Sequence, residues 1–173
     1  EFIRNAEVFV DETFFGGASV SRLMYRMANY YLLEPERVHV CTMSAKQLIL
    51  PMNETRYAHL FDMKDSGDDF YFDNVIDYVR RVMADIEKLS FDKLLKREIR
   101  VTAQLIELGS EVCKVKLHPQ QSIARAQELA DMIDRILPEY TEIWNIRNYE
   151  MGIERFVGQL KARRDEMRAM KAD

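Results

Sequence analysis

Two long stretches of the sequence place apolar residues at steps of three and four, which is the spacing of one face of an α-helix. The first stretch runs from Phe72 to Leu89 and the second from Leu94 to Cys113. Each stretch predicts a long amphipathic helix that must bury its apolar face against another element. A chain built around two such neighbouring helices is constrained to a core of packed α-helices.

Most of the remaining chain carries the same periodicity. The spacing predicts a helix over Ser19–Leu33, and Pro35 ends it because the proline ring disfavours a helical conformation in the residue before it. Further helices are predicted over Ile123–Leu137 and Tyr140–Met170. Pro138 lies between them and predicts a break or a new helix start, since proline is favoured at the first position of a helix.

Three other features set the expected boundaries. Val38–Leu50 alternates like a short strand at its beginning, but its later apolar positions fit a helix, and we favour a helix for this stretch. Pro51–Asp69 is rich in turn residues and predicts a loop around a short helical patch at Tyr57–Phe61. Ser90 is the predicted N-cap of the helix that follows it.

The composition agrees with a helical domain. Of the 173 residues, 47% are hydrophobic and 31% are charged, and six glycines and four prolines are few for a chain of this length. A chain of this size can bury about 70% of its surface without disulfides or metals. Because no repeat, low-complexity tract or composition shift divides the sequence, we expect residues 1–173 to form a single all-α domain. The expected architecture is an irregular antiparallel bundle of about six to seven helices.

The charge and hydropathy patterns exclude two classes of partner. The net charge is -4, so the chain lacks the basic field that attracts nucleic acid. No apolar run approaches the roughly 18 residues of a membrane-spanning helix, which predicts no membrane partner and a soluble, cytoplasmic protein. The basic segment 161–171 is expected to be a solvated helix end with cations at the favourable end of the helix dipole. Because the sequence begins at Glu1 rather than at methionine, we expect it to be processed or cut from a longer protein.

Motifs that mark common catalytic and metal sites do not occur in the sequence. The three histidines lie in or near connecting segments without a metal-ligand spacing: His39, His59 and His118. The acidic run from Asp62 to Asp73 lacks the alternate spacing of a calcium-binding loop. We therefore assign no catalytic, cofactor-binding or metal-binding residue.

Two other sets of side chains are expected to have structural roles. Glu98, Glu107 and Glu111 share one predicted helix without histidine partners, so we expect them to point outward or to be hydrogen-bonded. Cys41 and Cys113 are too few for a disulfide framework and lack the CxxC spacing of a redox or zinc site. We expect both to be buried thiols.

The segment 142–156 contains the candidate site. Its Trp144 is the only tryptophan in the chain, and Arg147, Asn148 and Gly152 follow at positions that place them on one helix face or at its end. An indole, a guanidinium and an amide together can stack and make several directed hydrogen bonds. These residues either hold a buried polar junction between helices or meet a partner surface.

The same four residues resemble the C-terminal helical region of bacterial β-N-acetylhexosaminidases of glycoside hydrolase family 20. Those enzymes often end in a helix with a tryptophan, an Arg-Asn pair and a glycine before a long final amphipathic helix. The similarity extends to Phe14–Ala18, to the helix end at Tyr30–Pro35 and to the Met43–Ser44 pair. The chain departs from the pattern at Ile143, where leucine is usual, and at Tyr149–Met151, which replaces a turn richer in proline and glycine.

The resemblance implies a non-catalytic domain of a glycosidase. In that family an Asp-Glu pair of a barrel assists attack by the substrate's own acetamido group. A (β/α)8 barrel takes about 250 residues, and the Asp11–Glu12 pair lies near the start of a helical chain rather than at the end of a barrel strand. The implied role is to pack on the catalytic barrel of the same parent chain or to form a homodimer interface. The alternative is a free-standing helical module that offers an amphipathic groove to a partner helix.

Overall fold

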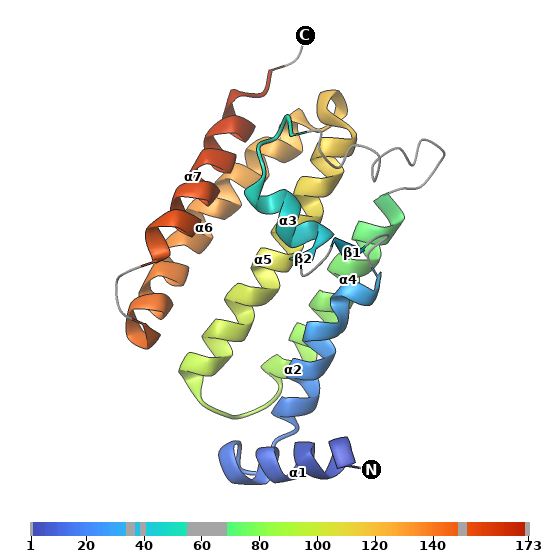
Figure 1. Cartoon of the computed structure of the whole chain (residues 1–173), viewed down its shortest axis with the longest axis vertical. Coiled ribbons are helices and arrows are strands. Elements are labelled where there is room, and N and C mark those ends of the chain that lie inside the picture. Colours follow the sequence, from blue (N-terminus) through green and yellow to red (C-terminus); the bar gives the residue numbers. More distant parts are fainter. Residues whose placement is uncertain (1, 34–36, 39–40, 55–68, 149–151, 172–173) are drawn as a thin grey trace.

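The computed structural model describes residues 2–33, 37–38, 41–54, 69–148 and 152–171. Within these ranges the chain forms seven α-helices, two 3₁₀-helices (η1 and η3) and one pair of two-residue strands (Figure 1). The elements are α1 (Phe2–Phe14), α2 (Val20–Ala28), η1 (Asn29–Leu33), β1 (Arg37–Val38), β2 (Cys41–Thr42), α3 (Met43–Ile49), α4 (Asp69–Glu87), α5 (Lys93–Leu117), η3 (Pro119–Gln121), α6 (Ile123–Arg147) and α7 (Ile153–Ala169). The prediction of an all-α helical bundle is confirmed.

Helix α5 is the centre of the bundle. It is 25 residues long, and α3, α4 and α6 all pack against it. In addition, α7 packs against α6, and α2 packs against α4. Figure 1 shows the α6–α7 pair on one side of α5 and α2 with α4 on the other, while α1 lies across the lower end. The fold is thus two groups of helices that share α5.

Two groups of buried side chains hold the helices together. One lies between α5, α6 and α7 and includes Val101 and Leu108 of α5. The other lies between α2, α4 and α5 and includes Ile99, Ala103 and Ile106 of α5. Because both groups draw on α5, this helix is apolar on more than one side, as expected for a helix packed between others.

Helix α3 crosses α5 at close range. At Gly109 of α5, a Cβ atom would lie 2.6 Å from the carbonyl oxygen of Ser44 and 2.9 Å from its carbonyl carbon. Interiors are packed too tightly for such an overlap to be absorbed without movement. Glycine therefore permits the crossing, and it brings Ser44 and Gln47 of α3 into fully buried positions.

The prediction of a helix break at Pro138 is wrong. Helix α6 extends over Ile123–Arg147 and contains Pro138 in its interior. A proline there lacks the N–H that would bond the carbonyl of Asp134, at a cost of about 3 kcal/mol. Leu137 and Ile143 are buried on either side of it. Packing against the bundle therefore outweighs the helix-breaking tendency of the proline.

The predicted start of α5 is also wrong, by two residues. The N-cap is Asp92 and not Ser90: the Asp92 carboxylate accepts a hydrogen bond from the backbone N–H of Leu95 at 2.8 Å. Serine and aspartate are both strong N-cap residues, so their order in the sequence does not decide which one is used.

The predicted helix over Val38–Leu50 is wrong in its first part. Strands β1 and β2 pair antiparallel there, with Val38 opposite Cys41, and α3 forms only the second part. The strand-like alternation at the start of the stretch also differs from the structure, because Val38 and Cys41 belong to two separate strands rather than to one. Most of the predicted loop over Pro51–Asp69, including the patch at Tyr57–Phe61, lies outside the described residues.

The expectation of a solvated basic helix end is right only in part. Lys161, Arg168 and Lys171 are exposed, and Arg168 lies in the last turn of α7, at the favourable end of the helix dipole. Arg163 is buried, and Arg164 and Arg168 reach α6, where both bind Asp134, at 2.8 Å and 2.5 Å. These contacts, the hydrogen bond from Arg164 first, lower the pKa of the Asp134 carboxyl. The basic side chains of α7 therefore fasten it to α6.

Candidate functional site

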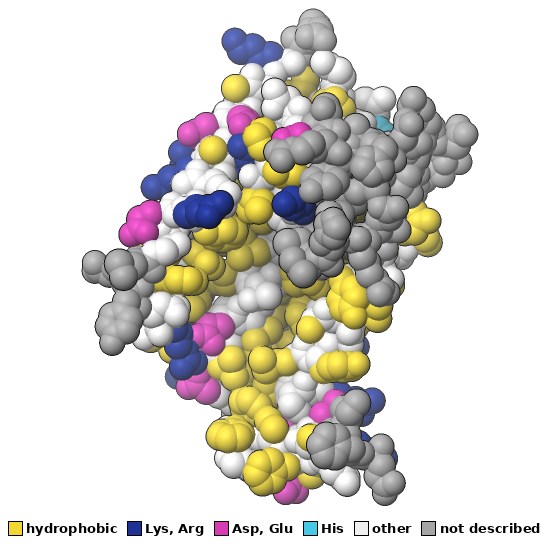
Figure 2. Space-filling model, in the orientation of Figure 1, with side chains coloured by type: hydrophobic (Ala, Val, Ile, Leu, Met, Phe, Trp, Pro, Cys, Tyr) yellow, Lys and Arg dark blue, Asp and Glu magenta, His cyan; other side chains and the backbone are white. Residues whose placement is uncertain are grey.

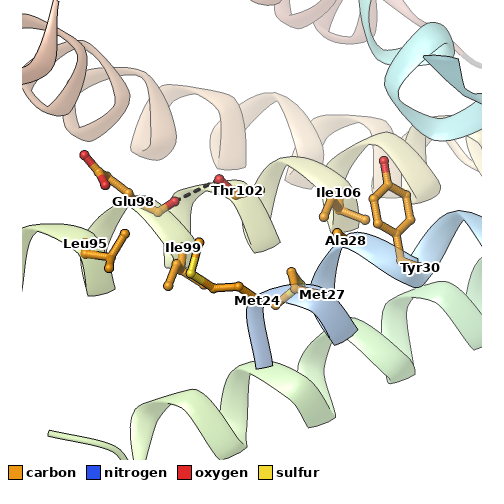
Figure 3. Close-up of a pocket in the computed structure, with 9 residues that line it drawn as sticks. All are labelled: Met24, Met27, Ala28, Tyr30, Leu95, Glu98, Ile99, Thr102 and Ile106. Carbon is orange, nitrogen blue, oxygen red and sulfur yellow. Dashed lines mark hydrogen bonds between the residues drawn. The ribbon is translucent and has the colours of Figure 1, made fainter. Parts of the chain in front are cut away.

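A groove between α2 and α5 is the candidate functional site, and we call it the α2–α5 groove (Figure 3). Its cavity measures about 280 Å³. The lining is mainly apolar and comes from α2, η1 and α5: Met24, Met27, Ala28, Tyr30, Leu95, Glu98, Ile99, Thr102 and Ile106. Figure 2 shows hydrophobic side chains gathered along the middle of one face of the molecule, between α7 and α2.

The helical periodicity of the two walls explains the groove. On α5 the lining residues follow one another at steps of four, three and four, so that they form a single stripe: Leu95, Ile99, Thr102 and Ile106. Met24 extends from α2 toward Ile99 (Figure 3), and 38% of Met24 is exposed. Because methionine is unbranched and flexible, this wall can adapt to the shape of a bound apolar group.

One rim of the groove is a polar link between α5 and α6. The Thr102 hydroxyl donates a hydrogen bond to the backbone oxygen of Glu98 at 2.9 Å. The Glu98 carboxylate accepts hydrogen bonds from Arg147 Nε at 2.5 Å and from Arg147 Nη2 at 3.4 Å. The hydrogen bond to Glu98 raises the pKa of the Arg147 guanidinium, so this side chain stays charged. Arg147 thus contacts Glu98, and Glu98 lines the groove.

A second link joins the same two helices. Arg97 of α5 donates to the two carboxylate oxygens of Glu142, at 3.1 Å and 2.9 Å, and to Glu139 at 3.2 Å. The hydrogen bond from Arg97 lowers the pKa of the Glu142 carboxyl. Paired contacts between a guanidinium and a carboxylate fix orientation, although pairs this exposed contribute little stability. The two links lie beside the groove and orient α6, which the buried side chains between α5, α6 and α7 hold in place.

The structure divides the four predicted site residues between two places. Trp144, Asn148 and Gly152 form the corner between α6 and α7, whereas Arg147 reaches α5. Asn148 ends α6, and its backbone N–H donates to the carbonyl oxygen of Trp144 at 2.7 Å. Gly152 precedes α7 with a φ of 102°, a conformation that favours glycine, and a Cβ there would lie 4.0 Å from the Trp144 ring.

Trp144 is half-buried in a row of aromatic rings. Its centroid lies 6.2 Å from that of Tyr140, and the Tyr140 centroid lies 5.1 Å from that of Phe156 on α7. Burial raises the pKa of the Tyr140 hydroxyl. Such tilted ring pairs add to the packing of the two helices. The structure therefore places Trp144 at a junction between helices, and its contact with a partner stays a prediction.

Sequence reasoning missed the α2–α5 groove itself. Met24 and Ile99 lie in stretches that the periodicity assigned to helices, but apolar positions at helical spacing are normally expected to be covered. A usable signal lies in the helix lengths. The nine residues of α2 span about 14 Å, slightly less than the stripe of about 16 Å from Leu95 to Ile106 on α5.

A second polar group holds α3 in place. Lys116 Nζ of α5 donates to the backbone oxygen of Gln47 at 3.0 Å, to Gln47 Oε1 at 2.9 Å and to the backbone oxygen of Leu50 at 3.1 Å. The ammonium group thus lies at the C-terminal end of α3, where carbonyl oxygens lack helical partners. Burial lowers the pKa of Lys116 to about 8.

The stability contributed by Lys116 is expected to change with pH. The unfolded chain keeps Lys116 protonated up to its ordinary pKa of 10.5, whereas the folded chain releases the proton near pH 8. Between these values the unfolded state binds more protons, so the free energy of unfolding rises with pH. Urea titrations at about pH 7.5 and about pH 9.5 should show this rise in the wild type and not in Lys116→Met. The same pH dependence in both proteins would contradict the assignment.

The glutamates of α5 are hydrogen-bonded, as expected. Glu98 binds Arg147, and Glu107 binds Arg80 of α4. Glu111 is buried and accepts from Arg125 Nη2 at 2.8 Å and from Arg125 Nε at 3.2 Å. These carboxylates therefore tie α5 to α6 and α4.

Other predicted groups are only partly described. Cys113 is buried, as expected, and His118 is exposed at the end of α5. The side chains outside the described set are those of Cys41, His39, His59, Asp62, Asp65, Asp68 and Asp69. Among the described residues, no three His, Cys, Asp or Glu side chains come together so that they could hold a metal ion. No helix in the described ranges is both long enough and apolar enough to cross a membrane.

Comparison with known proteins found no matching family model, no matching curated protein and no matching solved structure. The similarity to hexosaminidases therefore stays a prediction. The function is therefore inferred from the α2–α5 groove and the residues around it.

Proposed function

We propose that this chain is a helical interaction domain that binds an amphipathic helix of a partner in the α2–α5 groove. The observation that carries the proposal is the apolar hollow between the two helices, in which Met24 is exposed at the mouth, Ile99 and Ile106 form a buried floor, and Glu98 is the one charged side chain among the described residues. A groove between two helices suits an amphipathic helix, which lays its apolar face into it.

The dimensions of the groove fit one short helix. The stripe on α5 runs from Leu95 to Ile106, which is about 16 Å along the helix axis. A partner helix of about three turns covers this length with apolar residues at steps of three and four. Met24 and Met27 on the opposite wall can adjust to partner side chains of different shape.

The basic side chains at the beginning of α5 are mostly engaged within the chain. Lys96 and Arg100 bind Glu87 of α4, and Arg97 binds Glu139 and Glu142 of α6. Lys93 is exposed at the beginning of the helix. An acidic residue of the partner that reaches Lys93 would add a complementary contact.

The resemblance to hexosaminidases implies one particular partner, which is the catalytic barrel of the same parent chain. In that case the chain is the non-catalytic C-terminal domain of a β-N-acetylhexosaminidase-like glycosidase, and it packs on the barrel or forms a dimer interface. The coding region upstream of Glu1 tests this source. In-frame strands and helices over roughly 250 residues, with an Asp-Glu pair at a strand end, would support it. A start codon directly before Glu1 would contradict it.

Binding of a designed peptide tests the groove. The probe is a helical peptide of about four turns with leucines at steps of three and four and glutamates on the flanks. Ala28 is exposed and lines the groove, so Ala28→Arg should keep the fold and place a charge in the site. We expect the affinity, measured by calorimetry, to fall at least about tenfold.

The matched control is Ala84→Arg. Ala84 is also exposed, but it lines a separate hollow between α4 and α5. This variant should bind the peptide with the affinity of the wild type. Equal affinities for the wild type and both variants would contradict the proposed site.

A further inference from the structure

Helix α3 is a short element that lies over the second half of α5. It has seven residues, and Figure 1 shows it across α5 toward the C-terminal end of that helix. It meets α5 closely at Gly109, where the backbone of Ser44 approaches, and again at Lys116, which binds its C-terminal end. Cys113 stands between these two positions, at steps of four and three on the same helix face, and it is fully buried. Helix α3 therefore covers this face of α5.

The contact that α3 makes contains more polar than apolar side chains. Among the α3 side chains that the structure describes, Ser44, Gln47 and Leu48 are buried, and only Leu48 is a large apolar residue. An element with few buried apolar contacts can open at a lower free-energy cost than the whole domain. Opening of α3 alone is therefore less costly than unfolding of α5 with its two buried groups of apolar side chains.

Lys116 is the main polar tie between the two helices. All three of its hydrogen bonds, at 2.9 to 3.1 Å, go to oxygen atoms of Gln47 and Leu50, so they exist only while α3 lies on α5. The backbone N–H of Met52 donates to Glu166 of α7 at 2.7 Å and holds the chain directly after α3. When α3 is in place, it also takes water away from the Lys116 amine.

The loss of water makes the closed arrangement disfavour the proton on Lys116. Burial is the largest cause that lowers its pKa to about 8. One other cation lowers the pKa and three groups raise it, from α7, from α5 itself and from the segment after α3: Arg163, Glu166, Cys113 and Glu54. If α3 leaves, water returns to the amine and the pKa returns toward its ordinary value of 10.5.

We propose that α3 is a movable cover on α5 that loss of the proton from Lys116 closes more firmly. The open form binds this proton more tightly than the closed form, so closing becomes more favourable as the pH rises from about 8 to 10.5. Below about pH 8 both forms keep the proton, and the balance no longer changes. The cover is then held least firmly, and its opening gives access to the buried face at Cys113. Because no described residue of α3 lines the α2–α5 groove, the cover works apart from the groove.

Hydrogen exchange of the backbone N–H groups of α3 tests the cover. The reference protein carries Cys113→Ala, so that this thiol does not titrate in the same pH range. Exchange rates are divided by those of the unfolded chain at the same pH. The amides of α3 should exchange faster than the buried amides of α6, because α3 opens alone. From pH 8 to pH 9.5 the protection of α3 should rise about tenfold.

Two further substitutions in the reference protein assign the effect. Lys116→Met keeps an apolar stem without the amine, so the rise in protection should disappear. Lys93→Met removes an exposed lysine at the other end of α5 and should keep the rise. Amides of α3 that are as slow as those of α6 would overturn the cover, because α3 would then open only with the whole domain. A reference protein without the rise, or a rise that persists in Lys116→Met, would overturn the role of the proton.

Discussion

Replacing Leu160 by alanine is expected to lower the free energy of unfolding by about 3 to 5 kcal/mol. Leu160 lies on α7, has 0% exposure and belongs to the buried group between α5, α6 and α7. Its truncation removes apolar contacts and leaves a cavity that the surrounding helices close only in part. Urea denaturation followed by circular dichroism measures the loss.

The control for this prediction is Val157→Ala. Val157 lies one turn earlier on α7 and is half-buried against the same group. Its truncation should cost about 1 kcal/mol, because less apolar surface is lost. A loss for Leu160→Ala no larger than the loss for Val157→Ala would mean that α7 does not unfold together with α5 and α6.

Replacing Gly109 by alanine is expected to lower the free energy of unfolding by about 1 to 3 kcal/mol. The new Cβ would meet the carbonyl oxygen of Ser44 at 2.6 Å, so α3 would have to move away from α5. The movement would also strain the hydrogen bonds from Lys116 to the end of α3. Alanine is the better helix former by about 1 kcal/mol, and the steric effect must exceed this gain.

Gly158→Ala is the matched control for the close crossing. Gly158 lies inside α7 and is exposed, and among the described residues nothing lies within 4 Å of its Cβ position. The same substitution should therefore stabilise the protein there, by up to about 1 kcal/mol. Opposite signs at the two glycines, measured by urea denaturation, would support the crossing. A gain in stability at both would contradict it.

Much of the fold follows from periodicity in the sequence. The stretches from Phe72 and from Leu94 become α4 and α5 because a long apolar stripe at helical spacing has few other ways to be buried. Pro138 shows where such reasoning fails. The local rule predicts a break, but α6 continues through Pro138, and residues on both sides of the proline are buried. Tertiary packing decides such cases, and a single sequence does not display it.

The candidate site was predictable only in part. The Trp144 segment is distinctive because it contains the only tryptophan of the chain next to an Arg-Asn pair. In the structure Arg147 of this segment binds Glu98, which lines the groove. The groove is made of ordinary helical positions such as Ile99, which look like core residues in the sequence. Ile99 is in fact buried between α2, α4 and α5 and forms the floor of the groove. The hollow above it depends on how α2 lies against α5, which is a property of the fold rather than of the local spacing.

Methyl NMR of the ten methionines during titration with the designed peptide tests binding through the α2–α5 groove most directly. The methyl signals of Met24 and Met27 should shift, because both side chains line the groove. The signal of Met167 should stay in place, because this residue is fully buried on α7. In Ala28→Arg the shifts should disappear. If the peptide binds and the methyl signals of Met24 and Met27 do not shift, the groove is contradicted as the binding site.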